Sequence, residues 1–97
     1  MTTDALFIPR LESIIRDRID AGDDGSYTAQ LAAAGIRRIA QKVGEEGVEV
    51  ALAATTGDCS ELVEEAADLV YHLLVLLAVS DVSLANVDAK LAARHAD

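Results

Sequence analysis

Two long segments with helical hydrophobic spacing meet at Gly57–Asp58, and this pair constrains the fold more than any other feature of the chain. The first covers residues 36–56, and the second runs from there to about residue 80. Gly57 is suited to end a helix in the left-handed conformation, and Asp58 with Glu61 three residues later resembles the capping box that starts one. The two segments are therefore predicted to form an antiparallel hairpin. The inner side of the first segment is predicted to consist of Ile39, Val43, Val50 and Ala53.

The N-terminal third of the chain is predicted to contain two shorter helices joined by a loop. The first helix, over residues 6–19, has apolar side chains at helical spacing. Two glycines and three aspartates favour a loop over residues 20–26. A short helix is then expected over residues 28–34, with Ser26 or Thr28 as its N-cap.

The C-terminal part is predicted to be helical as well. Ser83 is suited to cap a last helix, and Val82 and Val87 have the spacing of a hydrophobic staple. The only proline is Pro9, and only 3% of the residues are aromatic. This composition favours packed helices over a sandwich or barrel, which needs more aromatic and β-branched residues and more turns. The predicted fold is an all-α bundle of four to five helices, forming a single domain over residues 1–97.

The charge and cysteine content exclude several classes of function. The net charge is −9, from 17 acidic and 8 basic residues, and an acidic surface repels the phosphates of nucleic acids. An anionic substrate would therefore need a cation as mediator. The single Cys59 excludes an internal disulfide and suits a reducing compartment. No signal peptide and no apolar run of the roughly 20 residues that span a membrane are found, so a soluble, cytoplasmic protein without a membrane or nucleic-acid partner is expected.

The segment of residues 69–79 is apolar on nearly every side. A helix of this kind must be covered all round, which a small monomer achieves with difficulty. Association through this helix into a homodimer or a higher homo-oligomer is therefore expected. His72 and Tyr71 lie inside the segment and are predicted to be hydrogen-bonded core or interface residues rather than ligands.

Four acidic residues in the predicted hairpin are expected to lie at one height. Glu46 and Glu49 are three residues apart, and so are Glu65 and Asp68, which places each pair on one helix face. At 1.5 Å per residue, Glu49 lies about 13 Å before the turn and Glu65 about 11 Å after it. Unpaired carboxylates so close together would repel one another strongly. A hard cation with a preference for oxygen ligands, Mg²⁺ or alternatively Mn²⁺, would resolve this repulsion.

Two other interpretations of these acidic residues compete with the magnesium site. In the first, they are solvated helix faces, with Lys42 paired to Glu45 or Glu46 at helical spacing. In the second, they belong to a di-iron bundle, which requires a Glu three residues before a His. No Glu precedes a His at that distance in this sequence. The pattern therefore favours an all-oxygen site, and hence magnesium and phosphate chemistry.

Three stretches carry a resemblance to a known family: SYTAQL at residues 26–31, GIRRIAQKVGEEGVEVALAA at 35–54 and EEAADLVYHLLVLL at 64–77. Together they resemble the phosphoribosyl-ATP pyrophosphohydrolases, the enzymes of the second step of histidine biosynthesis. The resemblance covers roughly residues 6–95. The order of the motifs and the short length of the chain are similar to the stand-alone form of the enzyme rather than to its fusion with the cyclohydrolase of the next step. One departure is that Arg37 and Arg38 stand where family members often carry a lysine, which keeps the positive charge.

The resemblance implies a MazG-like all-α bundle completed by dimerisation, and the Mg²⁺-dependent hydrolysis of phosphoribosyl-ATP to phosphoribosyl-AMP and pyrophosphate. The signature of the wider group, E-x-x-E followed by E-x-x-D, assigns the metal to Glu46, Glu49, Glu65 and Asp68. Glu46, and next Glu45, is then expected to orient or deprotonate the attacking water. Phosphate contacts are expected from Lys42 and Arg38. Hydroxyl contacts to phosphate or ribose are expected from Ser26, Tyr27 and Thr28, whose alternative role is a helix cap with one packed aromatic.

Two alternative functions remain open at the level of the sequence. A house-cleaning nucleoside triphosphate pyrophosphohydrolase would have the same acidic site with a different base pocket. A non-catalytic helical dimerisation module would carry the acids only as surface charge, and Mg²⁺ would then leave its stability unchanged. The SYT segment and the QKVGEE segment favour the histidine-pathway enzyme over the first alternative.

Overall fold

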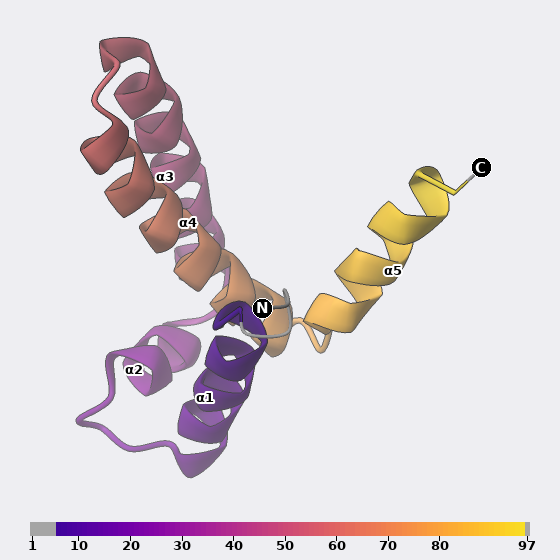
Figure 1. The fold of residues 1–97 in the computed structure, drawn as a ribbon. Coiled ribbons are helices and arrows are strands. Elements are labelled where there is room, and N and C mark those ends of the chain that lie inside the picture. The colour runs from indigo at the N-terminus through magenta and orange to yellow at the C-terminus, as the bar shows by residue number, and fades with distance from the viewer. Residues whose placement is uncertain (1–5, 97) are drawn as a thin grey trace.

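The computed structural model describes residues 6–96 and contains five α-helices and no strand within that range. The helices are α1 (Ile8–Ala21), α2 (Tyr27–Ala34), α3 (Ile36–Thr56), α4 (Cys59–Val79) and α5 (Leu84–Arg94). Figure 1 shows α3 and α4 side by side as a hairpin that extends away from α1 and α2, while α5 extends away from the rest of the molecule in another direction. The all-α prediction is thus confirmed.

The turn between α3 and α4 has the predicted local chemistry. Gly57 adopts a left-handed conformation with φ of 77° and donates its N–H to the carbonyl oxygen of Ala54. This conformation is strained for residues with a Cβ, which explains the glycine. The Asp58 carboxylate then accepts a hydrogen bond from the Glu61 N–H at 3.1 Å and caps α4. The hairpin, the left-handed Gly57 and the cap by Asp58 are therefore confirmed.

The N-terminal helices lie close to their predicted positions. Helix α1 begins and ends two residues later than expected, with Pro9 in its first turn, where a missing N–H costs little. Ser26 is the N-cap of α2, since its Oγ accepts a hydrogen bond from the Ala29 N–H at 3.2 Å. Thr28, the alternative cap, lies inside the helix and is buried.

The hydrophobic core lies where α1 and α2 meet the beginning of α3 and the end of α4. Four helices contribute to its fully buried part, which consists of Ile15, Leu31, Ile39, Leu74 and Val75. The part of the hairpin nearer its turn has less cover. Its exposed large apolar side chains include Val48, Leu52 and Val63.

The apolar segment of residues 69–79 is covered mostly from within the chain. His72, Leu74 and Val75 are buried, and among the large apolar residues of this segment only Leu73 is exposed. Helices α1, α2 and α3 pack against α4 and provide this cover. The exposed apolar surface of the described residues therefore lies mainly outside the segment from which association was predicted.

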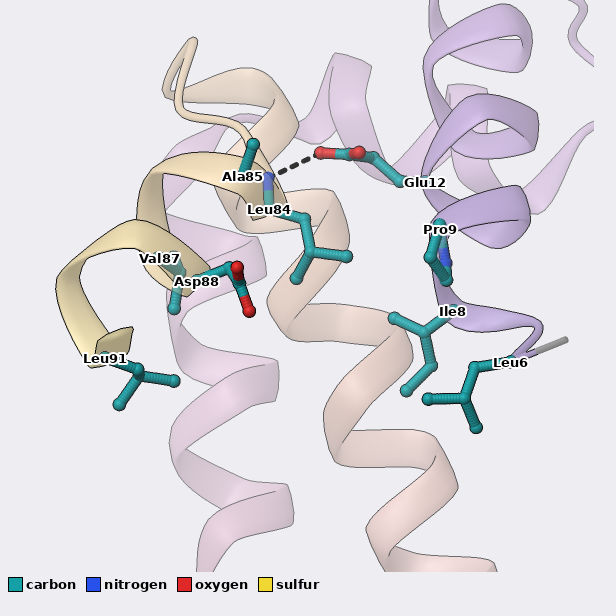
Figure 2. A pocket seen from close by; sticks show the side chains of 9 residues that line it. All are labelled: Leu6, Ile8, Pro9, Glu12, Leu84, Ala85, Val87, Asp88 and Leu91. Atoms are coloured by element: carbon teal, nitrogen blue, oxygen red, sulfur yellow. Dashed lines mark hydrogen bonds between the residues drawn. The ribbon is translucent and has the colours of Figure 1, made fainter. Parts of the chain in front are cut away.

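Helix α5 is attached to α1 by polar contacts at its first residue and in the turn just before it. Glu12 Oε2 accepts a hydrogen bond from the Leu84 N–H at 2.6 Å, and Arg16 Nη2 donates to the Val82 carbonyl at 2.9 Å. Figure 2 shows the Glu12 contact above an apolar groove between the two helices. The predicted cap is present, because Ser83 and Asn86 form a capping box. No residue of α5 is buried, so this helix depends on its few contacts at the joint.

Candidate metal and phosphate site

Acidic side chains from α3 and α4 face each other across the hairpin. Glu49 on α3 lies within hydrogen-bonding reach of Glu65 on α4. Asp68 and Glu61 lie near Glu65 on the same face of α4. Partial burial raises the pKa of Glu65 above its ordinary value, and the hydrogen bond to Glu49 and the surrounding negative charges raise it further. We refer to Glu49, Glu65 and Asp68 as the carboxylate cluster.

Glu46, the fourth predicted ligand, points toward a different set of partners. It is only 7% exposed, and its Oε1 lies 2.6 Å from His72 Nδ1 on α4. Its Oε2 lies 4.0 Å from Lys42 Nζ, one turn earlier on α3. The predicted pairing of Lys42 with a glutamate at helical spacing is therefore present, with Glu46 as the partner.

His72 joins the carboxylates to helix α2. Its Nδ1 lies 3.0 Å from the Asp68 carbonyl oxygen, and its Nε2 lies 2.9 Å from the Tyr27 hydroxyl. The contact of Nδ1 with Glu46 Oε1 is close but lacks the alignment of a hydrogen bond. The prediction that His72 is a buried, hydrogen-bonded residue is confirmed. Its neighbour on α3 is the acidic residue Glu46.

Two tyrosines and a threonine extend this polar cluster. Thr28 and Tyr71 share a short hydrogen bond between their hydroxyl groups. The rings of Tyr27 and Tyr71 stack with centroids 6.2 Å apart, and both meet the His72 ring edge-on. Of the SYT segment, Ser26 uses its hydroxyl for the helix cap. Tyr27 is the most exposed of the three, at 52%.

The remaining predicted site residues lie on the first half of α3. Arg38 is exposed, and Lys42, one turn later on the same helix, is half-buried. Glu45 is exposed and accepts a hydrogen bond from Gln41 Nε2 at 3.0 Å. Glu45 therefore points away from the partners of Glu46, although the two are adjacent in the sequence.

The donor chemistry of these residues fits a hard divalent cation. Carboxylate oxygens are the ligands that Mg²⁺ prefers, and a cation among them would offset the repulsion that raises the pKa of Glu65. Glu46 Oε1 is in addition a buried acceptor for which the described residues supply no aligned hydrogen bond. Within residues 6–96, however, no three Asp, Glu, His or Cys side chains converge in the geometry of a metal centre. The residues thus fit magnesium by donor type, whereas among residues 6–96 their side chains do not form a metal centre, with Glu46 turned toward His72.

The raised pKa of Glu65 predicts how stability depends on pH. The folded state binds the Glu65 proton more tightly than the unfolded state, so the associated stability is present below the unfolded pKa and is lost as pH rises through the folded pKa. Glu65→Gln cannot ionise and is expected to melt at a higher temperature than the wild type near pH 7. This advantage should vanish below about pH 4.

Thermal melting of both proteins across this pH range, in the presence of a chelator, measures the effect. Glu64→Gln is the matched control, because it removes a charge from the adjacent, exposed position of the same helix. An advantage of Glu65→Gln that is unchanged at low pH would contradict the prediction.

The sequence analysis missed the contact between Glu46 and His72. The signal was present, since His72 follows Asp68 by one helical turn and Glu46 was expected opposite Asp68. Periodicity indicates which residues share a level of the hairpin, but it does not indicate the rotamer that each side chain adopts.

Comparison with known proteins places these features in a family context. The family model described as phosphoribosyl-ATP pyrophosphohydrolase matches residues 8–95. The chain is 57% identical over 90 residues to the histidine biosynthesis bifunctional protein HisIE of Photobacterium profundum, which is 93% of this chain and 44% of that protein. It is 58% identical over 92 residues to the protein of the same name from Pasteurella multocida, covering 95% of this chain and 46% of that protein.

The chain thus spans a little under half the length of these relatives. The predicted correspondence to a stand-alone enzyme stays a prediction. Among residues 6–96, no single helix is long and apolar enough to cross a membrane.

Proposed function

Because this chain belongs to the phosphoribosyl-ATP pyrophosphohydrolase family, we propose that it hydrolyses phosphoribosyl-ATP to phosphoribosyl-AMP and pyrophosphate in the cytoplasm. This reaction is the second step of histidine biosynthesis, and the relatives are named for that pathway. The observation that carries the proposal is the carboxylate cluster between α3 and α4, whose mutual repulsion contributes to the raised pKa of Glu65. A solvated helix face would not bring acids from two helices together in this way.

The proposed cofactor is Mg²⁺, with Mn²⁺ as the alternative. The residues that would hold it are the carboxylate cluster and Glu46, which all offer oxygen donors. When bound, the ion would neutralise negative charge on the triphosphate of the substrate. The net charge of −9 makes such a cation necessary for an anionic substrate to approach this face of the hairpin.

Basic and acidic residues of α3 supply the rest of the proposed chemistry. Lys42 and Arg38 lie one turn apart and would contact phosphate oxygens. Glu46 is the carboxylate proposed to orient the attacking water, because it is buried beside the backbone of Asp68. Glu45, the second choice, is exposed and bonded to Gln41, which makes it the weaker candidate.

The SYT segment would contribute to substrate binding mainly through Tyr27. The hydroxyl groups of Ser26 and Thr28 have partners within the protein, in the helix cap and in Tyr71 respectively. The Tyr27 side chain is half-exposed, and its hydroxyl is bonded to His72. It can therefore contact a substrate and the buried polar cluster at the same time.

We also propose that the protein is a homodimer. An isolated helix of 11 residues is marginally stable in water, yet α5 has this length and has no buried residue. Exposed apolar side chains on the hairpin and on α5 would be covered by a second copy. These side chains are Val48, Leu52, Val63 and Leu91.

The proposed function is tested by measuring pyrophosphate release from phosphoribosyl-ATP and from common nucleoside triphosphates, with Mg²⁺ and with a chelator. Strong, Mg²⁺-dependent preference for phosphoribosyl-ATP is the expected result. Comparable turnover of ordinary triphosphates would instead assign a house-cleaning activity, and no release would leave a non-catalytic module. Sedimentation of the same preparation is expected to give twice the chain mass of 10.2 kDa, and a monomer mass would refute the dimer.

A further inference from the structure

His72 connects three helices through one side chain. It belongs to α4, lies against Glu46 of α3, and is bonded to Tyr27 of α2. It is 6% exposed, so water cannot substitute freely for these partners. The predicted metal and phosphate contacts assign no role to His72. Its observed partners, however, suggest a role.

The partners of the imidazole fix the position of its hydrogen. Nδ1 faces the Asp68 carbonyl at 3.0 Å, and a carbonyl oxygen only accepts hydrogen bonds. Nδ1 therefore carries a hydrogen, and Nε2 pairs with the Tyr27 hydroxyl at 2.9 Å. The Glu46 carboxylate lies 2.6 Å from the same Nδ1. The Nδ1 hydrogen therefore has two acceptors beside it, the Asp68 carbonyl oxygen and the Glu46 carboxylate. A carboxylate is the stronger acceptor of the two types.

Glu46 has few other means of support. Its exposed fraction is only 7%, and the described residues provide no aligned hydrogen bond to its Oε1. Within the described residues, the one Lys or Arg paired with Glu46 is Lys42, whose Nζ lies 4.0 Å from Oε2. A buried carboxylate without support would be driven toward water or toward another partner.

We propose that His72 is a positioning residue for Glu46, held in its own orientation by Tyr27. The Nδ1 side of the imidazole fixes the Glu46 carboxylate beside Asp68, and the Nε2 side is anchored at the half-exposed Tyr27. The importance of this arrangement for turnover rests on the proposed function, because Glu46 is the carboxylate assigned to the attacking water. The contact itself does not depend on that assignment.

Two amide substitutions separate the roles of the two ring nitrogens. The side-chain nitrogen of Asn can take the place of Nδ1, whereas the longer Gln reaches the position of Nε2. His72→Gln is therefore expected to lower kcat by about 10- to 100-fold with little change in KM, as loss of an orienting partner does. His72→Asn keeps a donor at the Nδ1 position but loses the bond to Tyr27, so it is expected to lower kcat only severalfold. If kcat falls equally in His72→Gln and His72→Asn, then His72 contributes only through packing and the proposal is overturned.

A double-mutant cycle tests the contact without substrate or cation. Urea unfolding is measured for the wild type, His72→Gln, Glu46→Gln and the double variant, in a chelator and at one protein concentration. If His72 acts through Glu46, its substitution has a smaller effect in the Glu46→Gln background than in the wild type. Additive effects would overturn the proposal whether or not the protein hydrolyses phosphoribosyl-ATP. Coupling in a protein without turnover would instead refute the proposed function alone.

Tyr27→Phe keeps the test valid if the His72 variants do not fold. It removes one hydroxyl from a half-exposed ring and leaves the stacking with Tyr71 in place. The expected result is a severalfold lower kcat in the wild-type background and no further loss in the Glu46→Gln background. An equal loss in both backgrounds would separate Tyr27 from Glu46 and refute the proposed chain of contacts.

Discussion

Glu49→Gln and Asp68→Asn are each expected to reduce turnover of phosphoribosyl-ATP by about 10²- to 10³-fold. Each change removes one negatively charged oxygen donor from the carboxylate cluster and keeps the shape of the side chain. Metal ions contribute several kcal/mol of charge stabilisation in hydrolysis of this kind, and each 1.4 kcal/mol corresponds to about tenfold in rate. The measurement is pyrophosphate release at saturating and subsaturating Mg²⁺.

Neither substitution is expected to unfold the protein, because Glu49 and Asp68 are both exposed side chains on helices. The helical circular dichroism should match that of the wild type, and thermal stability without Mg²⁺ should not fall, since a repulsive charge has been removed. Glu64→Gln serves again as the control and is expected to retain activity. Full activity in both Glu49→Gln and Asp68→Asn would show that the metal site lies elsewhere.

Ile39→Ala is expected to produce the largest loss of stability. Ile39 is 0% exposed and packs in the core shared by α1, α2, α3 and α4. Shortening a buried Ile to Ala costs about 2–5 kcal/mol, from lost burial and from the cavity left behind. This is a large fraction of the roughly 5–15 kcal/mol by which a typical domain is stable. Urea unfolding followed by circular dichroism gives the value.

Ile36→Ala is the matched control for this experiment. It makes the same change one turn earlier on the same helix, where the Ile side chain is 52% exposed. Its effect is expected to stay below about 1 kcal/mol, because little apolar surface is involved and Ala is the better helix former. Both variants must be compared at one protein concentration if the protein associates. Similar costs for the two variants would mean that Ile36 is also covered, for instance by a second copy.

The sequence was sufficient to predict the helices and most of their ends. Hairpin formation follows from local rules, because Gly57 tolerates a left-handed conformation and Asp58 can satisfy free N–H groups at the start of α4. The cap at Ser83 follows from the same rules. The height of the acidic residues along the hairpin could also be predicted from the sequence, since it requires only the rise per residue and the position of the turn.

The tertiary structure decided which partners the predicted site residues select. Glu46 lies on the predicted level but is turned to His72, and the hydroxyl of Thr28 is bonded to Tyr71. These choices depend on rotamers and on how α2 packs against the hairpin, which helical periodicity does not encode. The cover of residues 69–79 by α1, α2 and α3 is likewise a property of packing.

The sequence by itself therefore determined the helical hairpin and the caps, because these depend on interactions between residues close in the chain. It also determined which acidic residues share one level of the hairpin, because that depends only on their spacing from the turn. Only the tertiary structure decided that Glu46 lies against His72 and that α5 is attached through Glu12 and Arg16. Those contacts join residues that are distant in sequence, with Glu12 and Leu84 separated by 72 positions. Their geometry depends on how the helices pack around the shared core, which places residues distant in sequence next to one another.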